Sequence, residues 1–343
     1  MRFIRNYFLL LLGFTFFLTS CNLSKQSVKK PNDAWMAAFY NVENLFDTIN
    51  DPTINDEEFL PGSKLDWNTE KYQKSLAQKA RVLAALDSLD FPHFVGLSEI
   101  ENRAVLDDLV KTPALVDADY SIIHISDNDH RGIEVAAIYR SDYFKLLATE
   151  ALEPNLEKPE SMRHVLYVKG LISGGDTLHI FVNHWTSRYG GKDETAPRRA
   201  LYGDFLRQLS DSLLALNPMA HIVIMGDLND NPTDLSITAH LQAVGPNDLD
   251  AASRLFNLSL PLYEAGEGTL YYRSWDFFDQ VIVSRALLNS EKPSVRAFEV
   301  VKHPWMLYQP KKGDARPNRM SSGGRYFGGF SDHLSVVLYL NVD

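Results

Sequence analysis

Short apolar runs, several of them alternating with polar residues, recur along most of the chain. In one run Ile180 and Val182 point to one face and their neighbours to the other, a period of two that is typical of a half-buried strand. Glycines around residues 169–175 indicate a hairpin, and therefore antiparallel pairing. The pattern predicts strands at residues 35–40, 94–97, 121–125, 134–139, 165–172, 177–182, 221–225, 278–283 and 335–340.

Longer segments have apolar residues at helical spacing, as in Leu201, Phe205, Leu209 and Leu213. Such spacing predicts helices at residues 70–89, 104–110 and 200–216. Strands with mostly antiparallel pairing and helices outside them form an α/β sandwich. The pattern does not decide whether the strands form one sheet or two.

The first twenty residues have the pattern of an export signal. Arg2 and Arg5 precede an apolar segment at residues 8–17, and Leu-Thr-Ser-Cys at 18–21 matches a lipoprotein signal-peptidase site. A transmembrane anchor is the alternative, but the segment is shorter than the ~20 residues that a span needs. We expect residues 1–20 to be removed and Cys21, the only cysteine, to carry the lipid. The protein would then be exported and anchored to a bacterial membrane, on the periplasmic side or at the cell surface.

Residues 21–33 are polar and rich in lysine, and they are interpreted as a tether. From residue 34 to residue 343 there is no repeat, low-complexity segment or further shift in composition, so we expect one domain and a monomer. With 45% hydrophobic and 23% charged residues the chain resembles an ordinary globular protein. A single cysteine means that the exported domain would be stabilised by packing without disulfides.

The formal net charge of −10 argues against a protein that coats nucleic acid passively, since such proteins carry a basic stripe. It does not exclude a nuclease, because a catalytic groove needs only local positive charge, and metal-binding carboxylates themselves make the total negative.

Acids, amides and histidines stand at the ends of several apolar runs. The run at 221–225 is followed by Gly226, Asp227 and Asn229, whose side-chain oxygens are two positions apart on a turn and suit a hard cation or a phosphate. Alone, this is also an ordinary Asx-rich turn. The recurrence of polar residues at the ends of apolar runs in one domain indicates a functional site. The other polar ends are Asn41, Glu99, Asn183-His184, Asp279 and Ser331-Asp332-His333.

In their order along the chain and in their residues, these segments resemble the endonuclease/exonuclease/phosphatase superfamily, which includes deoxyribonuclease I. The resemblance runs from about Met36 to Leu340. It implies a four-layer α/β sandwich in which two packed, mostly antiparallel sheets are flanked by helices. It also implies a divalent-metal-dependent hydrolase of phosphoester bonds, most often a nuclease.

The resemblance implies a role for each residue. Glu99 would bind Mg²⁺ or Mn²⁺, with Asn41 and Asp332 near the ion. His333 would be the general base, oriented by Asp279. Asp227 and Asn229 would hold the phosphate, the attacking water or a second ion.

On the opposite side, His184 would hydrogen-bond the phosphate or the leaving group. The resemblance places the acidic partner of this histidine just inside the strand that follows a loop containing arginine and glycine, which here is Glu134. An acid among apolar strand residues also needs a partner if it is buried. A surface position on the strand is the alternative for Glu134.

Arginines supply the candidate substrate contacts. Arg188 follows His184 in a glycine-containing loop, and Arg198 and Arg199 lie near the start of a helix, where cations oppose the helix dipole. Either Asp193 and Glu194 or a substrate phosphate would compensate them. Arg131 and Arg163 are further candidates.

Three functions remain open. A nuclease is favoured, with nucleic acid as its substrate. A phospholipid or sugar-phosphate phosphoesterase of the inositol-phosphate type is the second possibility, although the chain has no long apolar hairpin for entering lipid. The third is an inactive surface binding module, which is disfavoured because no metal ligand or terminal histidine is missing.

Overall fold

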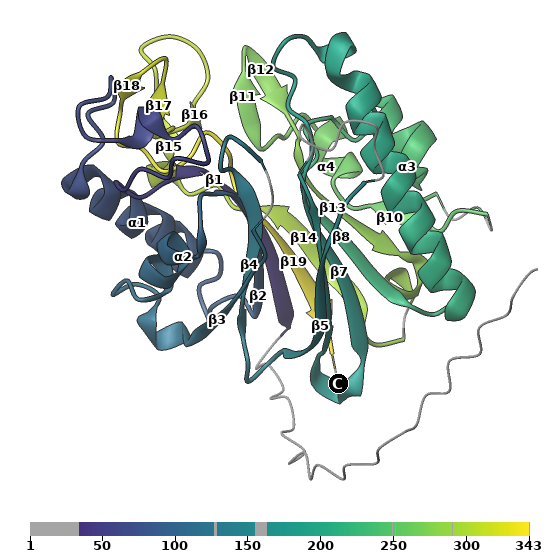
Figure 1. Cartoon of the computed structure of the whole chain (residues 1–343). Coiled ribbons are helices and arrows are strands. Elements are labelled where there is room, and N and C mark those ends of the chain that lie inside the picture. The colour runs from purple at the N-terminus through teal and green to yellow at the C-terminus, as the bar shows by residue number, and fades with distance from the viewer. Residues whose placement is uncertain are drawn as a thin grey trace, which may run out of the picture.

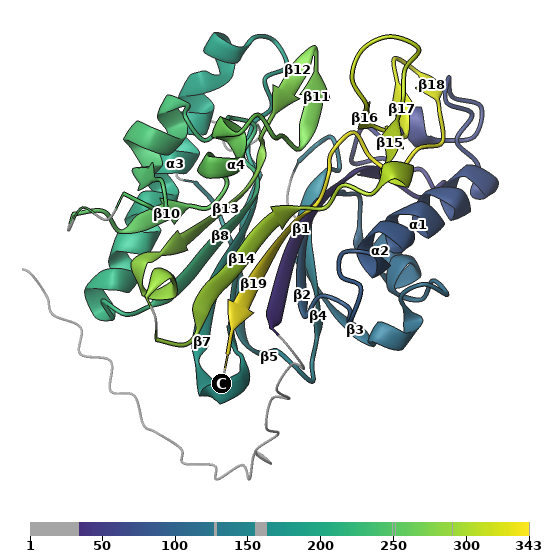
Figure 2. The same cartoon turned by 180° about the vertical axis from the view of Figure 1, so that it is seen from behind.

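The computed structural model describes residues 34–126, 129–154, 163–248, 250, 252–289 and 291–342. The expected signal peptide, Cys21 and the tether lie outside these residues. The described chain forms two large sheets that pack face to face, with helices on their outer faces (Figures 1 and 2).

The first sheet has six strands, and β1 and β2 are its only parallel neighbours among the described residues. Its order is β14 (Ser294–Val300), β19 (Val336–Asn341), β1 (Trp35–Leu45), β2 (Phe94–Ile100), β4 (Glu134–Arg140) and β3 (Tyr120–His124).

The second sheet has seven strands, with parallel pairing between β7 and β8 and between β9 and β10. Its order is β5 (Lys145–Leu152), β6 (Val165–Leu171), β7 (Thr177–His184), β8 (His221–Asp227), β13 (Asp279–Ser284), β10 (Leu255–Asn257) and β9 (Ala243–Val244).

Three short hairpins lie at one end of the sandwich (Figure 1). They are β11–β12 (Leu270–Tyr272 and Ser274–Asp276), β15–β16 (Leu307–Tyr308 and Arg316–Pro317) and β17–β18 (Ser321–Ser322 and Arg325–Tyr326).

Each sheet buries both of its faces. Phe39, Phe94, Val182 and Met225 belong to the apolar core between the sheets. Helices α1 (Thr69–Ala84) and α2 (Arg103–Val110) cover the outer face of the first sheet. Helix α3 (Lys192–Leu216) covers the second, and α4 (Leu260–Glu264) is short. The expected four-layer sandwich with two sheets is confirmed.

The sequence missed ten of the nineteen strands in the described residues, eight of them only two or three residues long, and it misplaced two helix ends. Strands β5 and β14 lie at sheet edges with many exposed residues, so they lack the apolar alternation that marks buried strands. Helix α1 ends at Ala84, where Ala85 leaves helical geometry with its N–H bonded to the Val82 carbonyl. The side chain of Asp87 then accepts the N–H of Leu89 in the following turn.

Helix α3 begins at Lys192, eight residues before the predicted start, with Asp193 and Glu194 in its first turn. Acidic side chains in the first turn interact favourably with the helix dipole and stabilise the helix. Pro197 lies inside the helix, where it lacks the N–H that would bond the carbonyl of Asp193. Among the described residues, no helix combines the length and apolar character needed to cross a membrane.

Candidate active site

The polar strand ends of the two sheets meet at one edge of the sandwich. Strands β7 and β8 are parallel, and their register places His184 beside Asp227. Strand β13 runs the other way and begins there, with Asp279 beside Asp227. The first sheet contributes Asn41 from β1, and His333 comes just before β19, which pairs antiparallel with β1.

Asn41 joins two carboxylates from different sheets. Its Nδ2 donates to Glu99 Oε1 at 3.1 Å and to Asp227 Oδ2 at 3.0 Å. Its own oxygen accepts the backbone N–H of Glu43 at 3.0 Å, which fixes the orientation of the amide. Glu99 is fixed by the backbone N–H of Asn44, which donates to Oε2 at 2.9 Å. The two carboxylates therefore face one point.

The turn after β8 holds Asp227 through a close approach to β7. Gly226 has φ of 154°, and a Cβ there would lie 2.3 Å from the carbonyl oxygen of Asn183. Asp227 Oδ1 accepts the N–H of Asn229 at 2.9 Å, and the Asn229 amide donates to the Trp185 carbonyl at 3.0 Å. Only glycine lets the strands approach closely enough to fix this turn.

His333 and Asp279 form a buried pair. Their Nδ1 and Oδ2 atoms lie 2.7 Å apart. The Ser331 hydroxyl accepts the backbone N–H of His333 at 3.0 Å and donates to the Asn41 carbonyl at 2.7 Å, so the histidine loop is attached to β1. The other ring nitrogen, Nε2, lies 3.8 Å from Asp227 Oδ2. This arrangement aims Nε2 of His333 at the point where the carboxylates meet.

The carboxylates of Asp279 and Asp227 control the protonation of His333. Burial by itself lowers the pKa of His333, but the charges of Asp279 and Asp227 raise it well above its usual value. Burial raises the pKa of Asp227 to about 7, against the lowering effect of His333. Asp227 and His333 together therefore hold at least one proton near neutral pH.

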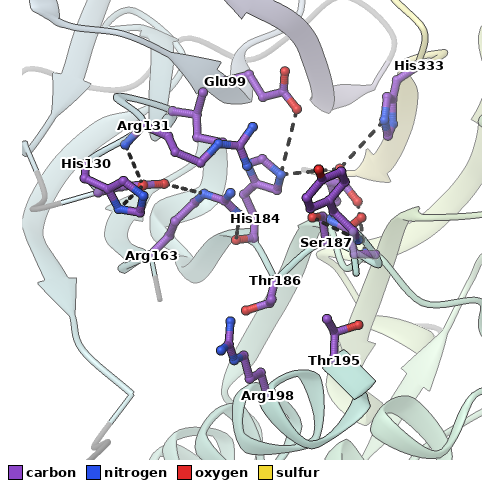
Figure 3. Close-up of a pocket in the computed structure, with 15 residues that line it drawn as sticks. Glu99, His130, Arg131, Arg163, His184, Thr186, Ser187, Thr195, Arg198 and His333 are labelled. Atoms are coloured by element: carbon purple, nitrogen blue, oxygen red, sulfur yellow. Dashed lines mark hydrogen bonds and ion pairs between the residues drawn. The ribbon is translucent and has the colours of Figure 1, made fainter. Parts of the chain in front are cut away.

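His184 occupies the other side of the same point. Its Nε2 lies 3.7 Å from Asp227 Oδ2 and 3.9 Å from Glu99 Oε1 (Figure 3). Burial lowers the pKa of His184 well below its usual value, and the nearby charges of Arg163, His333 and Arg131 lower it further. The imidazole is therefore neutral at pH 7.

A cavity of about 530 Å³ opens onto these residues. Glu99, Asp227, Asn229 and His333 line it together with His184. Further along, its wall is formed by the cationic side chains of Arg131, Arg163 and Arg198 (Figure 3).

Arg163 is the most deeply placed of these cations. Its Nε lies 3.0 Å from Asp129 Oδ2, and its Nη1 donates to the carbonyls of His184 and Trp185 at 3.2 and 3.1 Å. It is 7% exposed, so it positions the His184 backbone while its charge faces the cavity. Asp129 and the neighbouring His130 line the cavity, and the sequence interpretation had singled out neither.

The predicted pairing of Glu134 with His184 is wrong. Glu134 begins β4 and hydrogen-bonds His124 on the neighbouring strand β3. Among the described residues, Nδ1 of His184 has no hydrogen-bond partner. The sequence correctly indicated that a buried Glu134 needs a partner, but the nearest histidine in the sheet supplies it.

Two of the expected substrate contacts are structural. Arg188 donates to Asp230 Oδ1 at 3.0 Å and to Asp234 Oδ2 at 2.6 Å, and these carboxylates neutralise it. Arg199 is fully buried, and its Nε lies 2.8 Å from Asp230 Oδ2. A fully buried guanidinium does not reach substrate, so the expectation for Arg199 is corrected. Arg198 is the member of the pair that lines the cavity.

The metal assignments also change in detail. Asp332 lies 2.9 Å from Arg319 Nη2 and lines a different cavity, so it does not join the carboxylates of Glu99 and Asp227. The oxygen of Asn41 accepts one backbone N–H, and its nitrogen donates to both carboxylates, so Asn41 holds Glu99 and Asp227 in place; its expected position near an ion stays a prediction.

The remaining donors fit a hard divalent cation. Glu99 and Asp227 face one another across Asn41, and a cation would offset their repulsion. Asp227, Asp279 and His333 also offer ligand atoms within 4.8 Å of one another. Asp279 Oδ1 is buried without a hydrogen-bond partner among the described residues.

Comparisons with known proteins agree with this architecture. The model of the endonuclease/exonuclease/phosphatase family matches residues 36–342. No curated protein is significantly similar in sequence. Two solved structures illustrate the likeness in fold. TDP2 from D. rerio, complexed with a single-stranded DNA product, is 17% identical with a TM-score of 0.54, covering 90% of this chain and 98% of that chain. A mannosyl-6-phosphatase from Bacteroides thetaiotaomicron is 19% identical with a TM-score of 0.55, covering 90% of this chain and 100% of that chain.

At these identities the solved structures show the shared fold, and the family follows from the sequence match, which spans almost all of the described chain. The chain belongs to the endonuclease/exonuclease/phosphatase family and is a phosphoester-hydrolysing enzyme.

Proposed function

We propose that the protein is a divalent-metal-dependent nuclease that hydrolyses phosphodiester bonds. The observation that carries this proposal is the convergence of Glu99, Asp227, His184 and His333 on one cavity that also has an arginine-lined wall. A phosphodiester needs an activated water, charge neutralisation and a stabilised leaving oxygen, and this cavity offers groups for each need.

His333 is the proposed general base. Asp279 holds Nδ1, so Nε2 is the atom that accepts a proton from water. Because neighbouring carboxylates raise the pKa of His333, the ring must first lose its own proton before it serves as a base. Asn229, fixed by Asp227 and Trp185, lines the cavity beside it and would orient the phosphate or the water.

Glu99 and Asp227 would hold Mg²⁺ or Mn²⁺, which when bound supplies charge neutralisation and polarisation of the phosphoryl group. Asn41 keeps the two carboxylates facing one another. His184 is neutral and offers Nε2 for a hydrogen bond to the phosphate or the leaving oxygen. Arg131, Arg163 and Arg198 would attract the anionic substrate.

A sugar-phosphate phosphoesterase is the second candidate. The cavity volume of about 530 Å³ lies within the usual range for small-molecule sites, roughly 300–1,000 Å³. The comparison proteins span both classes, since one is a complex with single-stranded DNA and the other is named a mannosyl-6-phosphatase.

A substrate panel separates the two. Wild-type protein and His333→Ala are assayed with Mg²⁺ on duplex DNA, single-stranded DNA, RNA, bis-p-nitrophenyl phosphate, inositol phosphates, mannose 6-phosphate and sphingomyelin. Polynucleotide cleavage that depends on His333 supports the nuclease. Hydrolysis restricted to phosphomonoesters contradicts it and favours the second candidate.

The cellular location is part of the proposal. The segment before residue 34 has an export signal, a lipidation site at Cys21 and a polar tether, so the enzyme would be held at a bacterial membrane by lipid alone. Metabolic labelling with a palmitate analogue tests this point. Label on wild type that is absent from Cys21→Ser is expected, and an unlabelled wild type contradicts it.

A further inference from the structure

A second cavity, of about 860 Å³, lies among the three short hairpins at the same end of the sandwich. Strand β11 contacts β16, and both views place the hairpins together (Figures 1 and 2). We call the cavity the hairpin groove and define it by exposed rings and guanidiniums, namely Tyr272, Arg273, Tyr308, Arg316, Arg325 and Phe327.

The aromatic rings of the hairpin groove are unusually exposed. Tyr272 is 70% exposed, and Tyr308 and Phe327 are each 49% exposed. One ring comes from each hairpin region, so the rings are separate platforms on different segments. Exposed rings gathered at one site indicate a binding surface, because rings left in solvent add little to the stability of the folded protein.

The arginines carry charge that the protein does not neutralise. Among the described residues, Arg273, Arg316 and Arg325 have no carboxylate within ion-pair distance. Each guanidinium carbon instead lies over a ring of the groove, 5.5 Å from Tyr272, 5.5 Å from Tyr308 and 5.4 Å from Phe327, respectively. In a chain with a net charge of −10, this is a local concentration of free positive charge.

The hairpin groove adjoins the active site. Asp332 lines the groove and directly precedes His333. Arg319, which also lines the groove, lies 2.9 Å from Asp332 and 3.6 Å from the buried Glu43, two residues beyond Asn41. A β-bridge between Leu270 and His333 attaches the β11–β12 hairpin to the histidine loop. A polymer held at His333 would therefore continue into the groove.

We propose that the hairpin groove binds a single-stranded stretch of nucleic acid that flanks the scissile phosphate. Unpaired bases stack on Tyr272, Tyr308 and Phe327, and backbone phosphates contact Arg273, Arg316 and Arg325. Duplex bases are already stacked on one another and do not present free faces, so the groove selects unpaired strands. The inference rests on the proposed nuclease activity and names its preferred substrate.

The test is fluorescence anisotropy of a labelled dT12 oligonucleotide in EDTA, which prevents cleavage. A matched abasic 12-mer has the same phosphate charge without bases. The variants are Tyr272→Ala/Phe327→Ala, Tyr308→Ala and Arg316→Gln/Arg325→Gln. Leu216→Ala and Arg254→Gln, exposed residues near or beyond the end of α3, are controls for loss of surface area and charge.

The expected result is a Kd for dT12 that rises at least tenfold in the aromatic double variant and at least threefold in Tyr308→Ala. The Kd for the abasic strand should change less than twofold in these variants. The arginine variant should weaken both ligands and reduce the dependence of the Kd on salt. Both controls should bind like wild type.

Equal losses for dT12 and the abasic strand would overturn the stacking, and an unchanged Kd in every variant would overturn the groove. Hydrolysis of bis-p-nitrophenyl phosphate with Mg²⁺ separates this inference from the proposed function, since the small ester does not reach the groove. Normal hydrolysis without groove-dependent binding refutes only the groove, whereas groove-dependent binding without any hydrolysis refutes only the nuclease.

Discussion

His333 Nδ1 lies 2.7 Å from Asp279 Oδ2, although 54 residues separate the two in the chain. Asp279 is fully buried and His333 is 7% exposed, so the carboxylate determines which ring nitrogen faces the cavity. The pair joins the loop before β19 of the first sheet to β13, an interior strand of the second.

Replacing His333 with alanine should reduce kcat by about 10²- to 10⁴-fold, the usual contribution of a general base. Thermal unfolding should remain cooperative, because the space left by the deleted imidazole opens onto the cavity. Steady-state hydrolysis of bis-p-nitrophenyl phosphate and circular dichroism check the two parts. Near-normal turnover would remove His333 from the mechanism.

Arg198 and Arg199 should behave differently despite being neighbours. Arg199→Met removes one of the two guanidiniums beside the buried Asp230, and we expect the free energy of unfolding to fall by about 1–3 kcal/mol. Arg198→Met changes stability by less than about 0.5 kcal/mol but should raise KM, because Arg198 lines the cavity. Urea denaturation and kinetics on both variants measure this contrast, and identical behaviour would refute it.

Gly226→Ala should damage the site through the backbone. A Cβ would lie 2.3 Å from the Asn183 carbonyl oxygen, so β7 and β8 must separate, which we expect to cost about 1–3 kcal/mol and to displace Asp227. Gly266→Ala is the matched control, since Gly266 also has positive φ but has open space around its Cβ position. Loss of kcat only in Gly226→Ala is expected. Equal kinetics in both variants would mean that the close approach is not needed.

His93 should make stability depend on pH. Burial lowers the pKa of His93 to about 4, and its Nδ1 accepts the Met36 N–H at 2.9 Å, which requires a neutral ring. The unfolded chain takes up the proton near pH 6.5, so the stabilisation is complete above that pH and is lost as pH falls from 6.5 towards 4. The difference between the pKa of His93 in the unfolded chain and in the folded protein corresponds to a loss of roughly 3 kcal/mol in the free energy of unfolding at most.

His93→Asn keeps an acceptor for Met36 and removes the titration. Urea denaturation between pH 4 and pH 7 should show a shallower loss of stability in this variant than in wild type. Parallel pH profiles for the two proteins would show that His93 does not contribute.

The sequence predicted the residues at the strand ends because polar side chains interrupt otherwise apolar runs there. Asp227 and His184 were found in this way, and parallel pairing of β7 and β8 places them together. Arg198 and Arg199 could not be separated, since adjacent helical residues point about 100° apart and the start of α3 was misplaced.

Long-range partners were also beyond the sequence. Arg188 is neutralised by Asp230 and Asp234, more than forty residues later, and no local pattern connects them. Glu134 was recognised as an acid in need of a partner, but the choice of His124 depends on the pairing of β3 with β4.

The central claim is that Glu99 and Asp227 hold a divalent cation that phosphoester hydrolysis requires. The most direct measurement is turnover of bis-p-nitrophenyl phosphate by protein stripped with EDTA and titrated with Mg²⁺ or Mn²⁺, for wild type, Glu99→Gln and the exposed control Glu150→Gln. We predict no turnover without metal, recovery in wild type and Glu150→Gln, and at least a tenfold higher metal requirement in Glu99→Gln. Full turnover in EDTA, or a Glu99→Gln titration that matches wild type, would contradict the account.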